Sequence, residues 1–104
     1  MVRVEIRFSA GQGKKRRPAV ILSGDDYHRS RADTVVLALS SQMQVTYYGD
    51  CELLDYQDAG LPAPTKAKGV IETVAQASID HQYGFLTAVD FVRVKDSVRE
   101  ILNL

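Results

Sequence analysis

A cluster of cationic residues leads directly into an apolar run, and this junction constrains the fold more than any other feature of the chain. The cluster ends at Arg17 and Pro18, and residues 20–22 are aliphatic. An unbroken run of this kind is typical of a strand covered on both faces. A residue before proline is held near extended geometry, and proline donates no ladder hydrogen bond. We therefore expect a strand that begins at Pro18, with Arg17 directed by the backbone after a flexible turn at Gly11 and Gly13.

Further segments carry the period of short strands. Residues 2–8 alternate apolar and charged side chains, which predicts a strand with one buried face. The apolar runs 34–39, 51–54, 70–74 and 85–86 predict additional strands or strand ends. Residues 24–26 have turn composition and lead into a polar segment through Asp33, and Gly49 and Asp50 predict another turn. Residues 55–68 form a long connection of the kind that is often functional.

One helix is expected at the C-terminal end. Thr87 and Asp90 have the spacing of a capping box, which predicts a helix start. Apolar side chains then recur at three- and four-residue steps, so one stripe should pack on the sheet. The stripe consists of Phe91, Val94, Val98 and Ile101 or Leu102. The sequence predicts a mainly β protein with a C-terminal helix, arranged as a small open barrel.

Length and composition indicate one ordinary domain spanning residues 1–104. The lone Cys51 cannot form an internal disulfide, and no segment resembles a membrane span or a signal peptide, so a cytoplasmic location is expected. The net charge is zero, but residues 1–33 hold eight basic and four acidic side chains. This asymmetry fits a basic face for a polyanion, and equally fits strands and turns that carry their charges outward.

The motifs of several common active sites are missing. His28, His81 and Cys51 lack the spacing of metal ligands, so we expect no metal and no cofactor. We interpret the histidines as surface residues and Cys51 as a small buried thiol. Residues 11–17 lack the spacing of a nucleotide-binding P-loop.

Arg17 and Ser40 remain as a pair suited to phosphoryl chemistry. Arg17 begins one expected strand and Ser40 ends the next, so antiparallel pairing would bring their side chains to the same end of the sheet. A guanidinium can stabilise a phosphorane oxyanion with paired donors, and a hydroxyl can add a further hydrogen bond. Taken alone, the two residues are also typical of a loop cation and a strand terminator.

Four segments, in order, resemble the MazF/PemK (Kid-like) toxins of type II toxin–antitoxin pairs. The segment Arg-Pro-Ala-Val-Ile-Leu-Ser at 17–23 resembles the family's opening motif, and 36–41 resembles its next strand with a hydroxyl residue. Residues 59–65 and 84–87 are similar to the family's Gly-Leu…Pro-Ser segment and to the Gly-x-Leu-[Ser/Thr] before its last helix.

The resemblance implies an SH3-like open barrel and a metal-independent, sequence-selective endoribonuclease that acts on single-stranded RNA through attack of the 2′-OH. It implies that Arg17 and Ser40 face the scissile phosphate, with Ser40 in place of the family's usual Thr. It also implies a homodimer and a cognate antitoxin whose acidic tail occupies the basic groove. The lack of an apolar run of spanning length adds the expectation of no membrane association.

The remaining RNA contacts are expected from position and charge. We assign RNA binding to Lys14, Lys15, Arg16, Ser41 and Gln42. His28, Asp26, Glu72 and Asp80 are open candidates for the general acid and base. Tyr47 and Tyr48 could stack on bases, but a core position in a strand is slightly favoured.

Two other functions compete with this one. The chain could be a CcdB-like toxin that binds a protein target such as gyrase, or a catalytically silent RNA-binding member of the family. Cleavage of a naked oligoribonucleotide separates the endoribonuclease from both.

Overall fold

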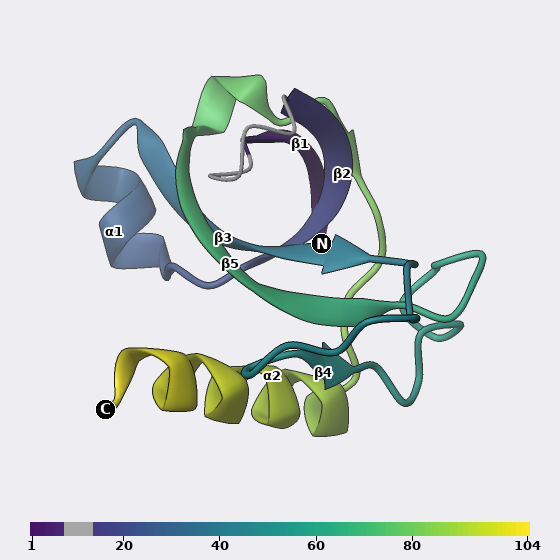
Figure 1. Cartoon of the computed structure of the whole chain (residues 1–104). Helices are drawn as coiled ribbons and strands as arrows, with labels where there is room; N and C mark the ends of the chain where they lie inside the picture. Colours follow the sequence, from purple (N-terminus) through teal and green to yellow (C-terminus); the bar gives the residue numbers. More distant parts are fainter. Residues whose placement is uncertain (8–13) are drawn as a thin grey trace.

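One antiparallel sheet of six strands is the main element of the fold, and its order is β4-β5-β3-β2-β1-β6. The computed structural model describes residues 1–7 and 14–104, and for Val2, Arg3, Glu5, Arg7, Lys14 and Lys15 it describes the backbone alone. The elements are β1 (Val2–Arg7), β2 (Lys14–Ile21), α1 (Asp25–Ser30), β3 (Asp33–Ser40), β4 (Cys51–Glu52), β5 (Lys66–Ala75), the 3₁₀ turn η1 (Gln76–Ser78), β6 (His81–Gln82) and α2 (Ala88–Leu102). The sheet curls strongly but stays open, with β4 and β6 at its edges (Figure 1). The predicted mainly β fold with a C-terminal helix is confirmed.

Strand β3 lies at the centre and is buried on both faces. Its alternate residues enter two different clusters, with Leu37 and Leu39 in one, and Val36 and Ala38 in the other. All four are fully buried. Burial of one of the larger aliphatic side chains stabilises the folded state by roughly 1.5–3 kcal/mol. This two-sided burial explains why residues 34–39 read as a continuous apolar run rather than as an alternating one.

Strand β2 begins earlier than the sequence indicated. The start at Pro18 is wrong, because Lys14–Ile21 is one strand and Pro18 lies within it, opposite Arg3 of β1. The strand extends because its first half pairs with β1. Val4 and Ile6 of β1 are fully buried. Pro18 is tolerated because the ladder from β2 to β3 begins only at Ala19. The expected turn at Gly11 and Gly13 lies outside the described residues.

The helix α1 lies where a turn at residues 24–26 and a polar segment through Asp33 were expected. Asp25 and Asp26 lie in the first turn of α1, where carboxylates favour the positive end of the helix dipole. The helix is six residues long and is tied to the sheet by side-chain hydrogen bonds rather than by an apolar stripe. Without that stripe the sequence carries no helical period to recognise.

Neither the two tyrosines at 47–48 nor residues 85–86 lie in a strand, contrary to expectation. Tyr47 and Tyr48 are 66% and 79% exposed, so the core position favoured for them is wrong. Phe85 is 76% exposed, and the nearby strand is the short β6. The predicted turn at Gly49 does form: Asp50 N donates to Tyr47 O at 3.0 Å, and Gly49 has φ +90°, which favours glycine.

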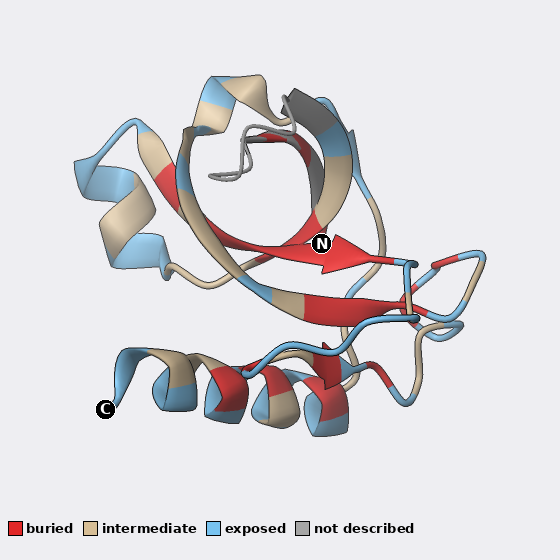
Figure 2. Ribbon diagram, in the orientation of Figure 1, coloured by how far each residue is buried: buried red, intermediate tan, exposed pale blue. Residues whose placement is uncertain are grey.

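The C-terminal helix α2 begins at the predicted cap and packs along one side of the sheet. Thr87 is the N-cap, and its hydroxyl accepts from Asp90 N at 3.3 Å. Figure 2 shows the burial confined to the side of α2 that faces the sheet. Val94 is fully buried there and Val98 packs against the same cluster, whereas Phe91 is half-exposed.

Asp90 ties this helix to the segment after β4. The carboxylate is fully buried and accepts from Leu54 N at 2.9 Å and from Asp55 N at 2.8 Å. Charge-assisted bonds of this kind hold backbone rigidly. The segment that leads toward residues 57–65 is therefore anchored at its start. Within residues 1–7 and 14–104, no helix is long and apolar enough to cross a membrane.

Candidate functional site

Arg17 and Ser40 lie at the same level of two neighbouring strands. Strands β2 and β3 pair antiparallel with Ala19 opposite Ala38, so two positions further along, Arg17 is level with Ser40. Residues two apart on a strand share a face, which places both side chains on the same face of the sheet. The predicted antiparallel pairing is confirmed, and with it the predicted proximity of the two positions.

A cavity of about 160 Å³ lies between these two side chains and the segment that precedes β5. It is lined by Arg17, Pro18, Leu39, Ser40, Ser41, Leu61, Pro62, Ala63 and Thr65. Five of these residues are apolar, and the polar ones are a cationic arginine and three residues with hydroxyls. A cavity with an apolar lining and a few polar groups is the usual form of a ligand site.

Ser40 presents a hydrogen-bond donor to this cavity. The residue is buried, and its Oγ accepts from Gln42 N at 3.1 Å, the one hydrogen bond that the described residues give this hydroxyl. Since a serine hydroxyl both accepts and donates, its proton remains available for a bound acceptor. Gln42 therefore contributes its backbone N–H to orient Ser40, and its side chain does not line the cavity.

The connection between β4 and β5 forms the opposite wall. The long connection expected at residues 55–68 is confirmed in part, since β5 already begins at Lys66. Leu61 N donates to Tyr56 O at 3.1 Å, which folds the connection back toward the sheet. Residues 59–65 resemble a family motif, but the sequence alone does not place them in the site. Their two prolines are the sequence feature that could have indicated a fixed loop at this position.

Thr65 is a site residue that the sequence analysis missed. It is 6% exposed, it lines the cavity, and its Oγ1 donates to Ala63 O at 2.8 Å. Its own carbonyl accepts from Leu53 N at 2.9 Å. The residue is thus held by bonds on both its side chain and its backbone.

Arg16 and Arg17 are neighbours on β2, and their side chains have different surroundings. Arg16 Nε lies 2.7 Å from Asp80 Oδ2, and its terminal nitrogen donates to Ser78 O at 3.0 Å. Because neighbouring residues on a strand point to opposite faces, Arg16 does not line the cavity that Arg17 lines. The side chains of Lys14 and Lys15 lie outside the described part of the chain.

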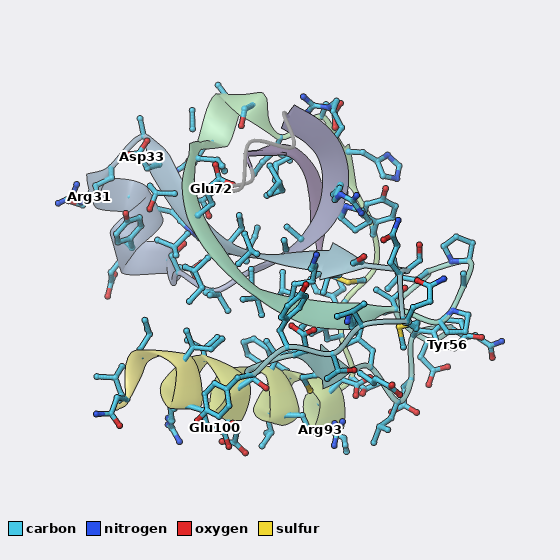
Figure 3. The ribbon with its side chains drawn as sticks, viewed as in Figure 1. Arg31, Asp33, Tyr56, Glu72, Arg93 and Glu100 are labelled. Atoms are coloured by element: carbon cyan, nitrogen blue, oxygen red, sulfur yellow. The ribbon has the colours of Figure 1, made fainter. Side chains whose placement is uncertain are left out.

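None of the four acid–base candidates is in the described lining of the cavity. Figure 3 places Glu72 on the curved part of β5, away from the end of the molecule that carries Tyr56. Asp80 is the partner of Arg16, and Asp26 pairs with Arg29 on the exposed face of α1. The sequence could name these groups as titratable but could not place them.

His28, the fourth candidate, belongs to a polar cluster at the other end of β3. Its Nε2 lies 2.7 Å from Ser23 Oγ and 3.1 Å from Thr34 Oγ1. Ser23 Oγ also accepts from Val35 N at 2.9 Å. Thr34 and Ser40 stand at opposite ends of one strand, roughly 20 Å apart. The cluster fastens α1 to the sheet and is remote from Arg17.

A buried ion pair holds the loop that follows Ser40. Lys66 lies opposite Ser40 in the β3–β5 ladder, and its Nζ is 2.8 Å from Asp50 Oδ2, with the two side chains 4% and 3% exposed. Lys66 Nζ also donates to Val45 O. Burial raises the pKa of Asp50, but the bond from Lys66 and those from Tyr47 N and Gly69 N outweigh it, and the pKa lies below its ordinary value. The loop's course is thereby fixed at Val45 and Asp50, on either side of the exposed Tyr47.

The family comparison agrees with the sequence resemblance. The model of the family described as "PemK-like, MazF-like toxin of type II toxin-antitoxin system" matches residues 2–102. No curated protein matches the chain in sequence.

Solved structures share the fold at low sequence identity. The Mycobacterium tuberculosis toxin MazF-mt6 superposes with a TM-score of 0.75 and 14% identity, covering 100% of this chain and 98% of that one. An endoribonuclease in complex with its cognate antitoxin from mycobacterial species gives 0.72 and 18%, covering 99% and 92%. A further M. tuberculosis toxin gives 0.69 and 16%, covering 82% and 91%. At these identities the likeness establishes the fold.

Proposed function

The chain belongs to the PemK-like, MazF-like toxin family of type II toxin–antitoxin systems, and from this premise we propose that it is an endoribonuclease that cuts single-stranded RNA without a metal ion. The observation that carries the proposal is the position of Arg17 level with Ser40, both lining one cavity. The endoribonuclease among the structural neighbours supports the same reaction class.

The chemistry uses the substrate's own nucleophile. The 2′-OH of the scissile nucleotide attacks the adjacent phosphorus and gives its proton to water. The bond from phosphorus to the 5′-oxygen of the next nucleotide breaks, and the leaving oxygen takes up a proton from water. The Arg17 guanidinium stabilises the charge that develops on the phosphorane with paired donors. The Ser40 hydroxyl donates a hydrogen bond to a non-bridging oxygen of the phosphate. The products are a 2′,3′-cyclic phosphate and a free 5′-OH.

Incubation of the purified protein with a naked oligoribonucleotide tests the proposal. Cleavage that depends on the intact site supports it. Gyrase inhibition without RNA cleavage would identify a toxin with a protein target. RNA binding without cleavage would identify a catalytically silent member.

A homodimer and a cognate antitoxin are part of the proposal. One structural neighbour is in complex with its cognate antitoxin. The beginning of α2 and the segment before it expose Phe85, Val89 and Val92 by more than half, beside an apolar cavity of about 270 Å³. Exposed apolar patches of this kind mark protein interfaces, and we place the second copy here. The lone, buried Cys51 is consistent with action in a reducing cytoplasm.

Lys14 and Lys15 are assigned to phosphates that flank the cut. This assignment predicts how the affinity for single-stranded RNA depends on salt concentration. Replacing both with glutamine should weaken single-strand binding for all sequences. The slope of log affinity against log salt should become shallower by roughly 1.4, since each lost contact releases about 0.7 fewer counterions. Fluorescence anisotropy titrations across a salt series measure this slope. A slope equal to that of the wild type would place both side chains away from the RNA.

A further inference from the structure

Among the residues that line the cavity, Ser40 and Thr65 have hydroxyls with opposite hydrogen-bonding roles. Thr65 Oγ1 lies 2.8 Å from Ala63 O, and because a carbonyl oxygen only accepts, the Thr65 proton is committed to that bond. What Thr65 can still offer a bound molecule is its lone pairs. Ser40 has the reverse arrangement, because it accepts from Gln42 N and retains its proton. The cavity thus combines a hydroxyl donor with a hydroxyl acceptor.

Thr65 is also placed rigidly. It is 6% exposed and follows directly on Pro64, whose ring fixes one backbone dihedral angle. Its carbonyl accepts from Leu53 N at 2.9 Å, and the next residue, Lys66, begins β5 opposite Ser40. An acceptor held by its backbone and by its own proton loses little entropy when it binds a ligand.

A ribonucleotide presents groups that match this pattern. The phosphate oxygens are acceptors and suit Arg17 and Ser40, whereas the neighbouring ribose carries a 2′-OH that is both donor and acceptor. The 2′-OH is on the carbon adjacent to the one that bears the scissile phosphate. A phosphate bound between Arg17 and Ser40 would therefore hold that hydroxyl near the wall that Thr65 forms.

We propose that Thr65 Oγ1 accepts a hydrogen bond from the 2′-OH of the scissile nucleotide and so orients the nucleophile for in-line attack. This inference rests on the proposed function and adds a substrate-positioning residue to it. Thr65 takes no proton in the reaction, because a neutral hydroxyl is a weak base. Its contribution is to hold the 2′-oxygen at the angle from which it meets phosphorus opposite the leaving oxygen.

The test compares two oligonucleotides that differ by one atom. Once the wild-type protein has mapped a cleavage site, binding is measured with Arg17 in place, on strands whose bridging 5′-oxygen at that site is replaced by CH2 so that it cannot leave. One ligand is the all-ribose strand and the other has a single 2′-deoxy sugar at the scissile position. With Thr65 present, the ribose strand should bind about fivefold tighter than the deoxy strand, which corresponds to one net hydrogen bond.

Adding Thr65→Val should reduce this preference to about one, by weakening binding of the ribose strand alone. Thr65→Ser keeps a hydroxyl and should restore the preference. Thr73→Val is the matched control, because Thr73 is exposed on β5 and should leave the preference unchanged. With unmodified RNA as substrate, Thr65→Val should lower kcat more than it raises KM, and Thr65→Ser should recover kcat.

A preference that survives Thr65→Val would overturn the inference, since the hydroxyl would then serve only to bond Ala63. Equal weakening of both strands would also overturn it, because Thr65 would then face a base or another donor. Failure of the proposed function is distinct from both outcomes: the wild-type protein would neither cut RNA nor bind either strand, and both proposals would fall together.

Discussion

Replacing Arg17 with alanine is expected to slow RNA cleavage by roughly 10²–10³-fold, the usual cost of removing one oxyanion donor. The guanidinium is the cation that the structure places in the cavity with Ser40. Its interaction with the bound phosphate strengthens as negative charge develops on the phosphorane, so the loss should be larger in kcat than in KM. Single-turnover cleavage of a mapped oligoribonucleotide measures it.

Four further variants test whether this effect comes from the Arg17 guanidinium and the cavity around it. Arg17→Lys keeps the charge but not the forked donors, and should recover only part of the rate. Arg29→Ala removes an exposed guanidinium from α1, remote from the cavity, and should leave the rate unchanged. Ser40→Ala should cost less than Arg17→Ala, and Ser40→Thr should be tolerated. A folded Arg17→Ala protein that cuts at the wild-type rate would refute the assignment.

Replacing Lys66 with methionine is expected to lower the free energy of unfolding by roughly 3–5 kcal/mol, because it leaves a buried carboxylate without its charged partner. Lys66 and Asp50 are both almost fully buried, and Lys66 also bonds the loop at Val45. Urea denaturation at neutral pH measures the change. Lys95→Met, on the exposed face of α2, is the matched control and should stay within about 0.5 kcal/mol of the wild type.

The double variant Lys66→Met/Asp50→Asn should regain much of the lost stability, since a buried pair is often replaceable as a unit. An additive loss in the double variant would contradict this account of the pair.

The same pair predicts how stability depends on pH. The folded-state pKa of Asp50 lies below its ordinary value, so its carboxylate contributes full stabilisation above about pH 4. That contribution is lost as the pH falls through the folded-state pKa, when the carboxylate takes up a proton. The double variant should lack this part of the acid dependence.

The sequence predicts correctly those elements that are marked by a pattern of apolar and polar residues, or by a cap, within a short segment. The alternation of β1, the apolar run of β3 and the cap of α2 at Thr87 are each visible within a few residues. The early start of β2 was missed because its charged first half is held by pairing with β1, which is a tertiary effect. The helix α1 was missed because it has no apolar stripe.

The site was only partly accessible to sequence reasoning. Arg17 and Ser40 could be brought together because antiparallel pairing follows from adjacent strands. The exposure of Tyr47 could not be predicted, since its turn is fixed by Lys66, far along the chain. Thr65 was missed because its acceptor character comes from one hydrogen bond to Ala63, which composition does not reveal.

The identity of the cleavage products tests the central claim most directly. The protein is incubated in excess EDTA with an RNA that contains one mapped site, and both fragments are analysed by mass spectrometry. If the 2′-OH is the nucleophile and Arg17 stabilises its attack, cutting persists without divalent ions. The upstream fragment then ends in a 2′,3′-cyclic phosphate and the downstream fragment begins with a free 5′-OH. A 5′-phosphate on the downstream fragment, or efficient cutting of a strand with a 2′-deoxy sugar at the scissile position, would contradict the account.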